Sequence, residues 1–276
     1  MKKDKHISFD RYYCCGRSLA LIHARDLSQE GVEELAKKMC DPFVGVGAQF
    51  LALVSSHEKS VCRIQVFDSL GKKIKHDETA LLSAAHWLHN RDGVDHVLFL
   101  DDRFEKKVTR FENDEFHVDL EPPAFDARSI PISTHEVPWG KPISIKDIRL
   151  KMYCLSIGEP FAVCFLDWQK NLDWISKIGP ELEGHFLFPK KASIVLAFVL
   201  NPQNLIVRVW ERGRGLQQGS LGGAAAAAVV AIRNEKAQSP VWVHTNAGKS
   251  QVYVMAQGVC LRTQPVHLFS GQFPLG

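Results

Sequence analysis

The sequence predicts an α/β protein made of two similar halves, each with a helix set within a curved β-sheet. The main observation is that one strand–loop–helix pattern occurs twice, at residues 66–88 and at residues 207–232. In each copy an apolar strand leads into a loop that contains glycine. An oxygen-bearing residue, Asp77 or Ser220, then stands at the N-cap position of an apolar helix. If the halves face each other, the two helix N-termini converge on one cleft, which would suit a small anion.

The composition is that of a globular protein without a strongly charged partner. The 276 residues are enough for two domains, with 45% hydrophobic and 24% charged residues. A net charge of +3 is too small to indicate nucleic acid or a membrane surface as a partner. The basic residues Lys2, Lys3 and Lys5 precede no apolar run, so they do not form a signal peptide. We therefore expect a cytoplasmic protein that binds neither nucleic acid nor membrane.

The cysteines and histidines predict no metal site. Seven cysteines, an odd number, are scattered through apolar segments, as expected for buried reduced thiols. Cys14 and Cys15 are adjacent, which suits neither a tetrahedral metal nor a relaxed disulfide. His86 and His89 share one helix face, where we expect hydrogen-bonded core residues rather than ligands. We expect neither a metal nor an organic cofactor.

In the first half, short apolar runs predict strands and apolar residues at helical spacing predict two helices. The first helix spans residues 28–40 with Ser28 as its cap, and the second follows Asp77. Asn113 and Asp114 predict a hairpin turn. Strands are expected at residues 19–24, 51–55, 62–67, 97–100, 106–111 and 116–120.

The second half repeats this order after two prolines at residues 122–123 and a weakly patterned connector at 124–148. A helix is expected near residues 172–178, and another follows Ser220, where five alanines at 224–228 would let surrounding strands approach closely. Strands are expected at residues 151–157, 161–166, 193–200, 206–210, 241–244, 251–255 and 259–263. The expected domains are residues 1–122 with 265–276, and residues 123–264, with the last strand returning to the first domain.

Four segments carry a resemblance to a known family. They are residues 43–48 (FVGVGA), 155–160 (LSIGEP), 179–183 (GPELE) and 210–215 (WERGRG), and they occur in the order seen in diaminopimelate epimerase. The similarity extends loosely from about Phe9 to the C-terminus. The resemblance implies a cofactor-independent amino-acid epimerase of two pseudo-symmetric domains, and a homodimer. In that family two cysteine thiols, one at the start of each central helix, remove and return the α-proton on opposite faces.

The chain departs from this family at the positions that carry the chemistry. The resemblance places Asp77 and Ser220 where the two cysteines belong, so both thiols are absent. Glu78 opens the segment that replaces a Gly-Asn-Gly sequence, and Gly222 lies in the turn after the second position. Five further substrate-facing positions of the family correspond here to different residues, Arg17, Asp68, Glu159, Phe161 and Ser193.

Glu211 and Arg212 are the retained residues, and the resemblance implies that they contact the ammonium and carboxylate groups of the amino acid. A second interpretation is that they form an internal ion pair that supports the loop. Asp77 and Ser220 likewise have a structural interpretation, as helix caps worth about 1 kcal/mol each.

Epimerisation needs two acid–base groups of similar strength on opposite faces of one carbon, which serine and a capping aspartate do not supply. Three hypotheses follow. In the first, the chain has lost epimerase activity and binds a small carboxylate, an amino-acid-like ligand or a partner. In the second, it is an isomerase with one base, Asp77 or Glu78. In the third, it is an active epimerase with relocated catalytic groups such as Cys14 or Cys15. The second route is chemically feasible because a phenazine-biosynthesis isomerase that resembles this scaffold uses an acidic residue.

Overall fold

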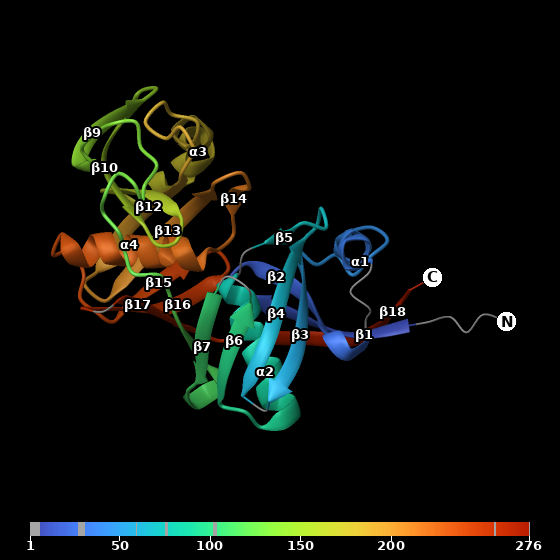
Figure 1. Ribbon diagram of the computed structural model, residues 1–276. Coiled ribbons are helices and arrows are strands. Elements are labelled where there is room, and N and C mark those ends of the chain that lie inside the picture. The colour runs from blue at the N-terminus through green and yellow to red at the C-terminus, as the bar shows by residue number, and fades with distance from the viewer. Residues whose placement is uncertain are drawn as a thin grey trace. The chain divides into compact units, whose positions relative to one another are not determined.

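The computed structural model describes residues 6–26, 31–58, 60–74, 77–101, 104–256 and 258–275 (Figure 1). The chain forms two compact units, Met1–Val118 with Thr263–Gly276 (unit 1) and Asp119–Arg262 (unit 2). The expected domain boundaries after residues 122 and 264 remain a prediction. Lys2, Lys3, Lys5 and Ser28 lie outside the described residues. Within the described ranges, no helix has the length and apolarity needed to cross a bilayer.

Unit 1 is a mixed sheet with two helices. Its strands run in the order β18–β1–β2–β3–β4–β6–β7–β8, with β2–β3 and β4–β6 parallel and the other pairs antiparallel. Each parallel pair is joined through a helix, as parallel strands require a crossover connection. The strands are β1 (His6–Cys14), β2 (Arg17–His23), β3 (Phe50–Glu58), β4 (Val61–Asp68), β5 (Lys73–Ile74), β6 (His96–Asp101), β7 (Phe104–Arg110), β8 (Phe116–Asp119) and β18 (Val266–Pro274), and the helices are η1 (Ala24–Asp26), α1 (Val32–Cys40), α2 (Glu78–Asp92) and η2 (Glu112–Asp114).

The C-terminal strand lies in unit 1, as the sequence predicts. Figure 1 shows the red β18 beside the blue β1, and the two strands pair antiparallel from His6 with Pro274 to Tyr13 with Val266. The strand β1 itself is not among the predicted elements.

Unit 2 repeats the topology of unit 1. Its strands run β9–β10–β11–β12–β13–β15–β16–β17, again with two parallel pairs, β11–β12 and β13–β15. Helix α3 stands where α1 stands, and α4 stands where α2 stands, so the predicted pseudo-symmetric fold is confirmed. The elements are β9 (Trp139–Ile145), β10 (Ile148–Ser156), β11 (Pro160–Phe165), η3 (Gln169–Trp174), α3 (Ile175–Glu183), β12 (Ser193–Asn201), β13 (Asn204–Glu211), β14 (Gly215–Gln217), α4 (Leu221–Arg233), β15 (Val241–Thr245), β16 (Gly248–Met255) and β17 (Gly258–Thr263).

Each unit surrounds one central helix with its sheet. Helix α4 packs against β10, β11, β12, β13, β15 and β16, and its alanines at 224–228 are at most 1% exposed. Helix α2 packs against β1, β2, β6, β7 and β18 in the same way. The small side chains of α4 allow strands on several sides to approach it. The predicted helix inside curved sheet is therefore present in both units.

One expected connector is wrong, and two expected helices are present with other bounds. Helix α1 begins at Val32 with Gly31 at its N-cap, whereas the sequence predicts a start at residue 28 with Ser28 as the cap. The connector expected at residues 124–148 contains β9, which carries Pro142 and pairs with β10 alone among the described strands. An edge strand tolerates a proline because its outer N–H groups have no partner strand. The helix expected near residues 172–178 is instead η3 followed by α3, which continues through Pro180.

Candidate functional site

The start of helix α2 is closed by the carboxylate of Asp77, which confirms its predicted role as the N-cap. Asp77 has extended backbone angles, and its Oδ1 accepts hydrogen bonds from the backbone N–H groups of Thr79 at 3.0 Å and Ala80 at 3.2 Å. The Thr79 hydroxyl also donates to the same oxygen. The donors that a helix start offers to an anion are therefore bound to a carboxylate of the chain itself.

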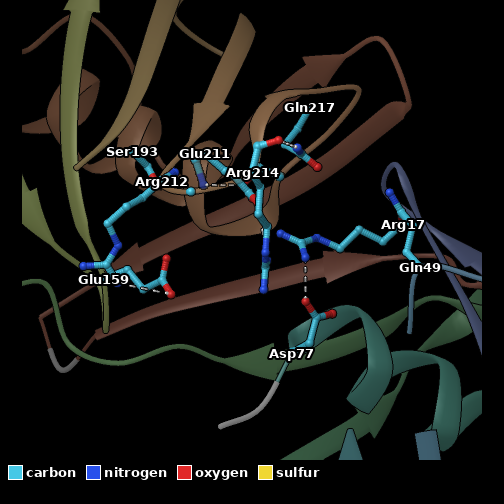
Figure 2. A network of polar contacts seen from close by, with 12 residues as sticks. Arg17, Gln49, Asp77, Glu159, Ser193, Glu211, Arg212, Arg214 and Gln217 are labelled. Carbon is cyan, nitrogen blue, oxygen red and sulfur yellow. Dashed lines mark hydrogen bonds and ion pairs between the residues drawn. The ribbon is translucent and has the colours of Figure 1, made fainter. Parts of the chain in front are cut away.

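The second carboxylate oxygen of Asp77 forms a buried ion pair. Arg17, the first residue of β2, places Nη1 3.0 Å from Asp77 Oδ2, as Figure 2 shows. Their side chains are only 9% and 8% exposed, and the Arg17 guanidinium also lies 5.4 Å from the centre of the Phe50 ring. Two residues that the sequence places separately in the site are thus brought together, and each satisfies the charge of the other.

Asp68, the third candidate residue in unit 1, stabilises a turn instead of contacting Arg17 or Asp77. Its Oδ1 accepts hydrogen bonds from the backbone N–H groups of Leu70 at 3.0 Å and Lys72 at 2.9 Å. This carboxylate shapes the turn between β4 and β5. Gly71 in that turn has φ +76°, and a Cβ there would lie 2.4 Å from the carbonyl oxygen of Glu33, so glycine is required.

The start of helix α4 is more open than that of α2. Ser220 is the N-cap, as predicted, and its Oγ accepts one hydrogen bond, from the Gly223 N–H at 3.1 Å. Among the described residues, the N–H groups of Leu221 and Gly222 have no hydrogen-bond partner. These are the donors that a helix start presents to a small anion.

Glycines bring neighbouring strands close to the α4 start. A Cβ on Gly222 would lie 2.9 Å from Cζ of Phe161 in β11, and one on Gly223 would lie 2.7 Å from Cγ2 of Val209 in β13. Gly222 therefore shapes the site through its size, since no larger residue fits beside Phe161.

The remaining candidates of unit 2 lie around the turn that follows β13. Ser193 is 1% exposed, and its Oγ accepts a hydrogen bond from the Arg212 N–H at 3.1 Å. The predicted ion pair of Glu211 with Arg212 is wrong in its partners. Glu211 lies 3.5 Å from Nη1 of Arg214, while the Arg212 side chain extends to Glu159 at 3.8 Å (Figure 2). Glu211 is the last residue of β13 and Arg212 is the first residue of the following turn, so the two neighbours contact different partners.

Glu183, at the end of α3, holds this turn and was not predicted as a site residue. Its Oε1 accepts hydrogen bonds from the Gly213 N–H at 2.7 Å and from Lys191 at 3.3 Å, and its Oε2 accepts one from the Trp210 indole at 2.8 Å. Burial raises the pKa of Glu183, but these donors outweigh it and hold the pKa below its usual value. The sequence signal is the GPELE segment, which contains Glu183 but does not show what it contacts.

His86 is part of the core, as predicted. It is 8% exposed and its Nδ1 lies 3.2 Å from the Tyr12 hydroxyl and 3.3 Å from Nδ2 of Asn90. Burial is the main cause that lowers the pKa of His86. The expectation of a shared cleft between the halves stays a prediction.

Comparisons with known proteins agree with this architecture. Diaminopimelate epimerase of Carboxydothermus hydrogenoformans is 30% identical over 216 residues, 77% of each chain. The enzyme of Halothermothrix orenii is 23% identical over 277 residues, which cover 96% of this chain and 97% of that protein. No family model matches the sequence.

Solved structures share the fold at low sequence identity. A phenazine biosynthesis protein of the PhzF family from Bacillus anthracis matches with a TM-score of 0.70 at 14% identity, covering 98% of this chain and all of that one. A hydroxyproline epimerase from Agrobacterium vitis, solved with bound trans-4-hydroxy-L-proline, matches with a TM-score of 0.64 at 7% identity, covering 100% and 94%. On the evidence of its sequence relatives, supported by its fold, the chain belongs to the diaminopimelate epimerase family.

Proposed function

We propose that this family member does not epimerise by the two-thiol route and instead binds a small carboxylate or amino acid at the start of α4. The observation that carries the proposal is the contrast between the two helix starts. The α2 start holds Asp77, its own anion, whereas at the α4 start the N–H groups of Leu221 and Gly222 have no hydrogen-bond partner in the described part of the chain. Glu211 and Arg212 close to this helix would select the charged groups of the ligand.

Loss of the usual activity follows from the side chains at the two caps. The Ser220 hydroxyl is 3% exposed and bonded as a cap, and no described side chain is hydrogen-bonded to it as a base that would make it a proton acceptor. The Asp77 carboxylate already accepts hydrogen bonds from two N–H groups and a hydroxyl and pairs with a guanidinium, so both of its oxygens are held in contacts within the protein. The one-base isomerase that uses Asp77 or Glu78 is therefore the second candidate.

The first test is exchange of the α-hydrogen of diaminopimelate with deuterium oxide, followed by NMR. We expect no exchange with the wild-type protein. Exchange that disappears in Asp77→Asn would establish the one-base isomerase instead, and exchange that disappears in Cys15→Ser would establish a relocated thiol. The double variant Asp77→Cys with Ser220→Cys tests whether the scaffold still admits the substrate.

The second test is binding, measured by thermal shift with a panel of small carboxylic and amino acids and then by calorimetry. Ser220→Asp places a carboxylate over the open donors of α4 and should abolish binding, while Ser220→Thr keeps a neutral cap and should retain it. Arg212→Ala should also abolish binding. Arg149→Ala removes an exposed cation of the same unit and serves as the control. Unchanged affinity in Ser220→Asp would remove the α4 start from the site.

The homodimer and the cytoplasmic location that the sequence suggests remain predictions. Sedimentation at several concentrations would test the first.

A further inference from the structure

Unit 2 contains a cavity of about 640 Å³ apart from the start of α4. Its walls come from the segment 134–144, which includes the middle of β9, from Met152 of β10, and from residues 185–187 in the loop after α3. Figure 1 shows β9, β10 and α3 together at one end of this unit. None of the described residues that line the cavity belongs to α4 or to the turn after β13. A cavity of this size is large enough for a small organic molecule.

The two main walls of the cavity are joined through the main chain. The N–H group of Ser133, beside Thr134 of one wall, donates a hydrogen bond to the carbonyl oxygen of Leu187 in the other wall at 2.9 Å. The loop that carries Leu187 is itself closed, because the Phe188 N–H donates to the carbonyl oxygen of His185 at 2.8 Å. The cavity is therefore preformed, and a ligand can enter it without first having to order the loop.

The floor of the cavity is apolar. Ile143 and Met152 are 8% and 1% exposed and belong to the core of unit 2, and Leu187 packs against that core. Phe186 also lines the cavity, yet it is 74% exposed, and the centre of its ring lies 4.4 Å from that of His185. An exposed aromatic ring beside an apolar floor offers a face against which a planar apolar group can pack.

Nitrogen donors outnumber carboxylates in the lining. Three nitrogen-bearing side chains line the cavity, those of His135, Lys141 and His185, and Glu136 is the one carboxylate among the described lining residues. The Nδ1 atom of His185 accepts a hydrogen bond from the Leu187 N–H at 3.3 Å, so the neutral ring carries its proton on Nε2. Burial lowers the pKa of His185, which favours this neutral form. The lining therefore suits a ligand that accepts hydrogen bonds.

Lys141 is available to such a ligand. Its ammonium lies 2.8 Å from Oε2 of Glu136, but the Lys141 and Glu136 side chains are 58% and 80% exposed. Ion pairs this exposed contribute little to stability, so the pair can open at small cost. An acidic group within the cavity can therefore take the place of Glu136 beside the ammonium.

We propose that the cavity formed by β9, β10 and the loop after α3 binds a small planar aromatic acid. The ring of the ligand packs on Ile143 and Met152, with one face toward Phe186. Its acidic group accepts hydrogen bonds from Lys141 and from the Nε2–H group of His185. This site shares no residue with the one proposed at the start of α4, so neither proposal depends on the other.

The first test is calorimetric titration of the full chain with naphthoate and, separately, with naphthylmethylamine, which carries a similar ring and the opposite charge. We expect naphthoate to bind and the amine to bind about tenfold more weakly, because Lys141 repels its charge. No heat of binding with naphthoate, or tighter binding of the amine, would overturn the proposal.

Substitutions in the lining test where naphthoate binds. Phe186→Ala should weaken the binding about tenfold through the lost aromatic contact, and Ser144→Trp, which fills the cavity from an exposed position of its lining, should abolish it. Lys141→Met should weaken it several-fold. Lys146→Met is the matched control, because it removes an ammonium of the same unit that is 59% exposed and lies 3.0 Å from Glu181, and the affinity should not change. Thermal unfolding checks that each variant is folded, and wild-type affinity in both Phe186→Ala and Ser144→Trp would overturn the proposal.

A last variant separates this cavity from the start of α4. Ser220→Asp closes the α4 start with a carboxylate and should leave naphthoate binding unchanged. Loss of naphthoate binding in Ser220→Asp together with wild-type affinity in Ser144→Trp would place the aromatic acid at the α4 start and would overturn the assignment to the cavity.

Discussion

The starts of α2 and α4 are equivalent in topology and opposite in electrostatics. Both helices begin with an extended cap residue inside curved sheet, yet α2 carries an anion with its own cation, and α4 carries a neutral hydroxyl with open donors. A duplicated helix start thus carries different polar contacts in its two copies. At α2 the cap is a carboxylate that pairs with Arg17, and at α4 the cap is a hydroxyl that accepts one hydrogen bond.

The turns that precede these helices differ in a related way. In unit 1, Asp68 holds the turn after β4 with its own side chain, through the N–H groups of Leu70 and Lys72. In unit 2, Glu183 from α3 holds the turn after β13 from outside, through the Gly213 N–H and the Trp210 indole. Because Glu183 stabilises the turn after β13, the side chains of Glu211 and Arg212 are not needed for that purpose.

The largest loss of stability is expected when the buried ion pair between Arg17 and Asp77 at the start of α2 is broken. Arg17→Met leaves the Asp77 carboxylate buried without its cation, and the free energy of unfolding should fall by about 3 kcal/mol, since removal of one partner of a buried pair is strongly destabilising. Urea unfolding measures the change. Adding Asp77→Ser, which copies the α4 cap, should recover part of the loss.

A matched control exists in unit 2. Arg212→Met removes a partner of Glu159 in a pair whose side chains are 32% and 60% exposed, so its cost should stay below about 1 kcal/mol. Equal costs for Arg17→Met and Arg212→Met would show that the Arg17 pair contributes no more than a surface contact.

The second largest effect is expected from the close packing at the α4 start. Gly223→Ala improves helix propensity but forces a methyl group against Val209, so we expect a net loss of about 2 kcal/mol. Ala80 is the equivalent position of α2 and is 1% exposed, so Ala80→Gly should cost about 1 kcal/mol through helix propensity and about 1 kcal/mol more through the loss of a buried methyl group. A more stable Gly223→Ala variant in thermal unfolding would contradict the packing argument.

A smaller effect is expected for the caps alone. Ser220→Ala removes one hydrogen bond from the α4 start and should cost about 1 kcal/mol. Asp77→Ala should cost more, because it also leaves Arg17 buried without its anion. The two variants are compared by urea unfolding at one pH, and the reverse order would contradict the electrostatic contrast between the helix starts.

The smallest change in the free energy of unfolding at neutral pH is expected for the substitution of Glu183. Because its pKa in the folded protein lies below the unfolded value, the ionised carboxylate adds stability above the unfolded pKa of about 4.3. That contribution is lost as the pH falls through the folded pKa. The urea midpoint should therefore drop more steeply in acid for wild type than for Glu183→Gln, with Glu181→Gln as the surface control.

The sequence predicts the fold largely through two local signals. Apolar runs define most strands, and the oxygen-bearing residues Asp77 and Ser220 mark the starts of the central helices. The strand β9 escapes prediction because Pro142 and polar neighbours interrupt its pattern, which only an edge position tolerates. The second half of α3 is also missed, because Gly179 and Pro180 are poor helix formers by sequence; in the structure Gly179 lies close against the Trp210 ring, where a Cβ would be only 2.7 Å from ring atoms.

The candidate site is less predictable because its contacts join residues far apart in the chain. Arg17 and Asp77 are both candidates from sequence, but their pairing depends on how β2 lies beside α2. Glu183 and Gly213 are likewise separated by β12 and β13. The partners of Glu211 and Arg212 depend on where β13 ends and its turn begins, and the sequence pattern does not show that boundary.

The pairing of β18 with β1 has a consequence for how the protein is made. Unit 2 is continuous from Asp119 to Arg262, whereas unit 1 needs the segment Thr263–Gly276 to finish its sheet. During synthesis, unit 2 can therefore close while β1 still awaits β18, its neighbour from the end of unit 1. Residues of β1 leave the ribosome before unit 2 does, yet they are among the last to acquire their final hydrogen bonds.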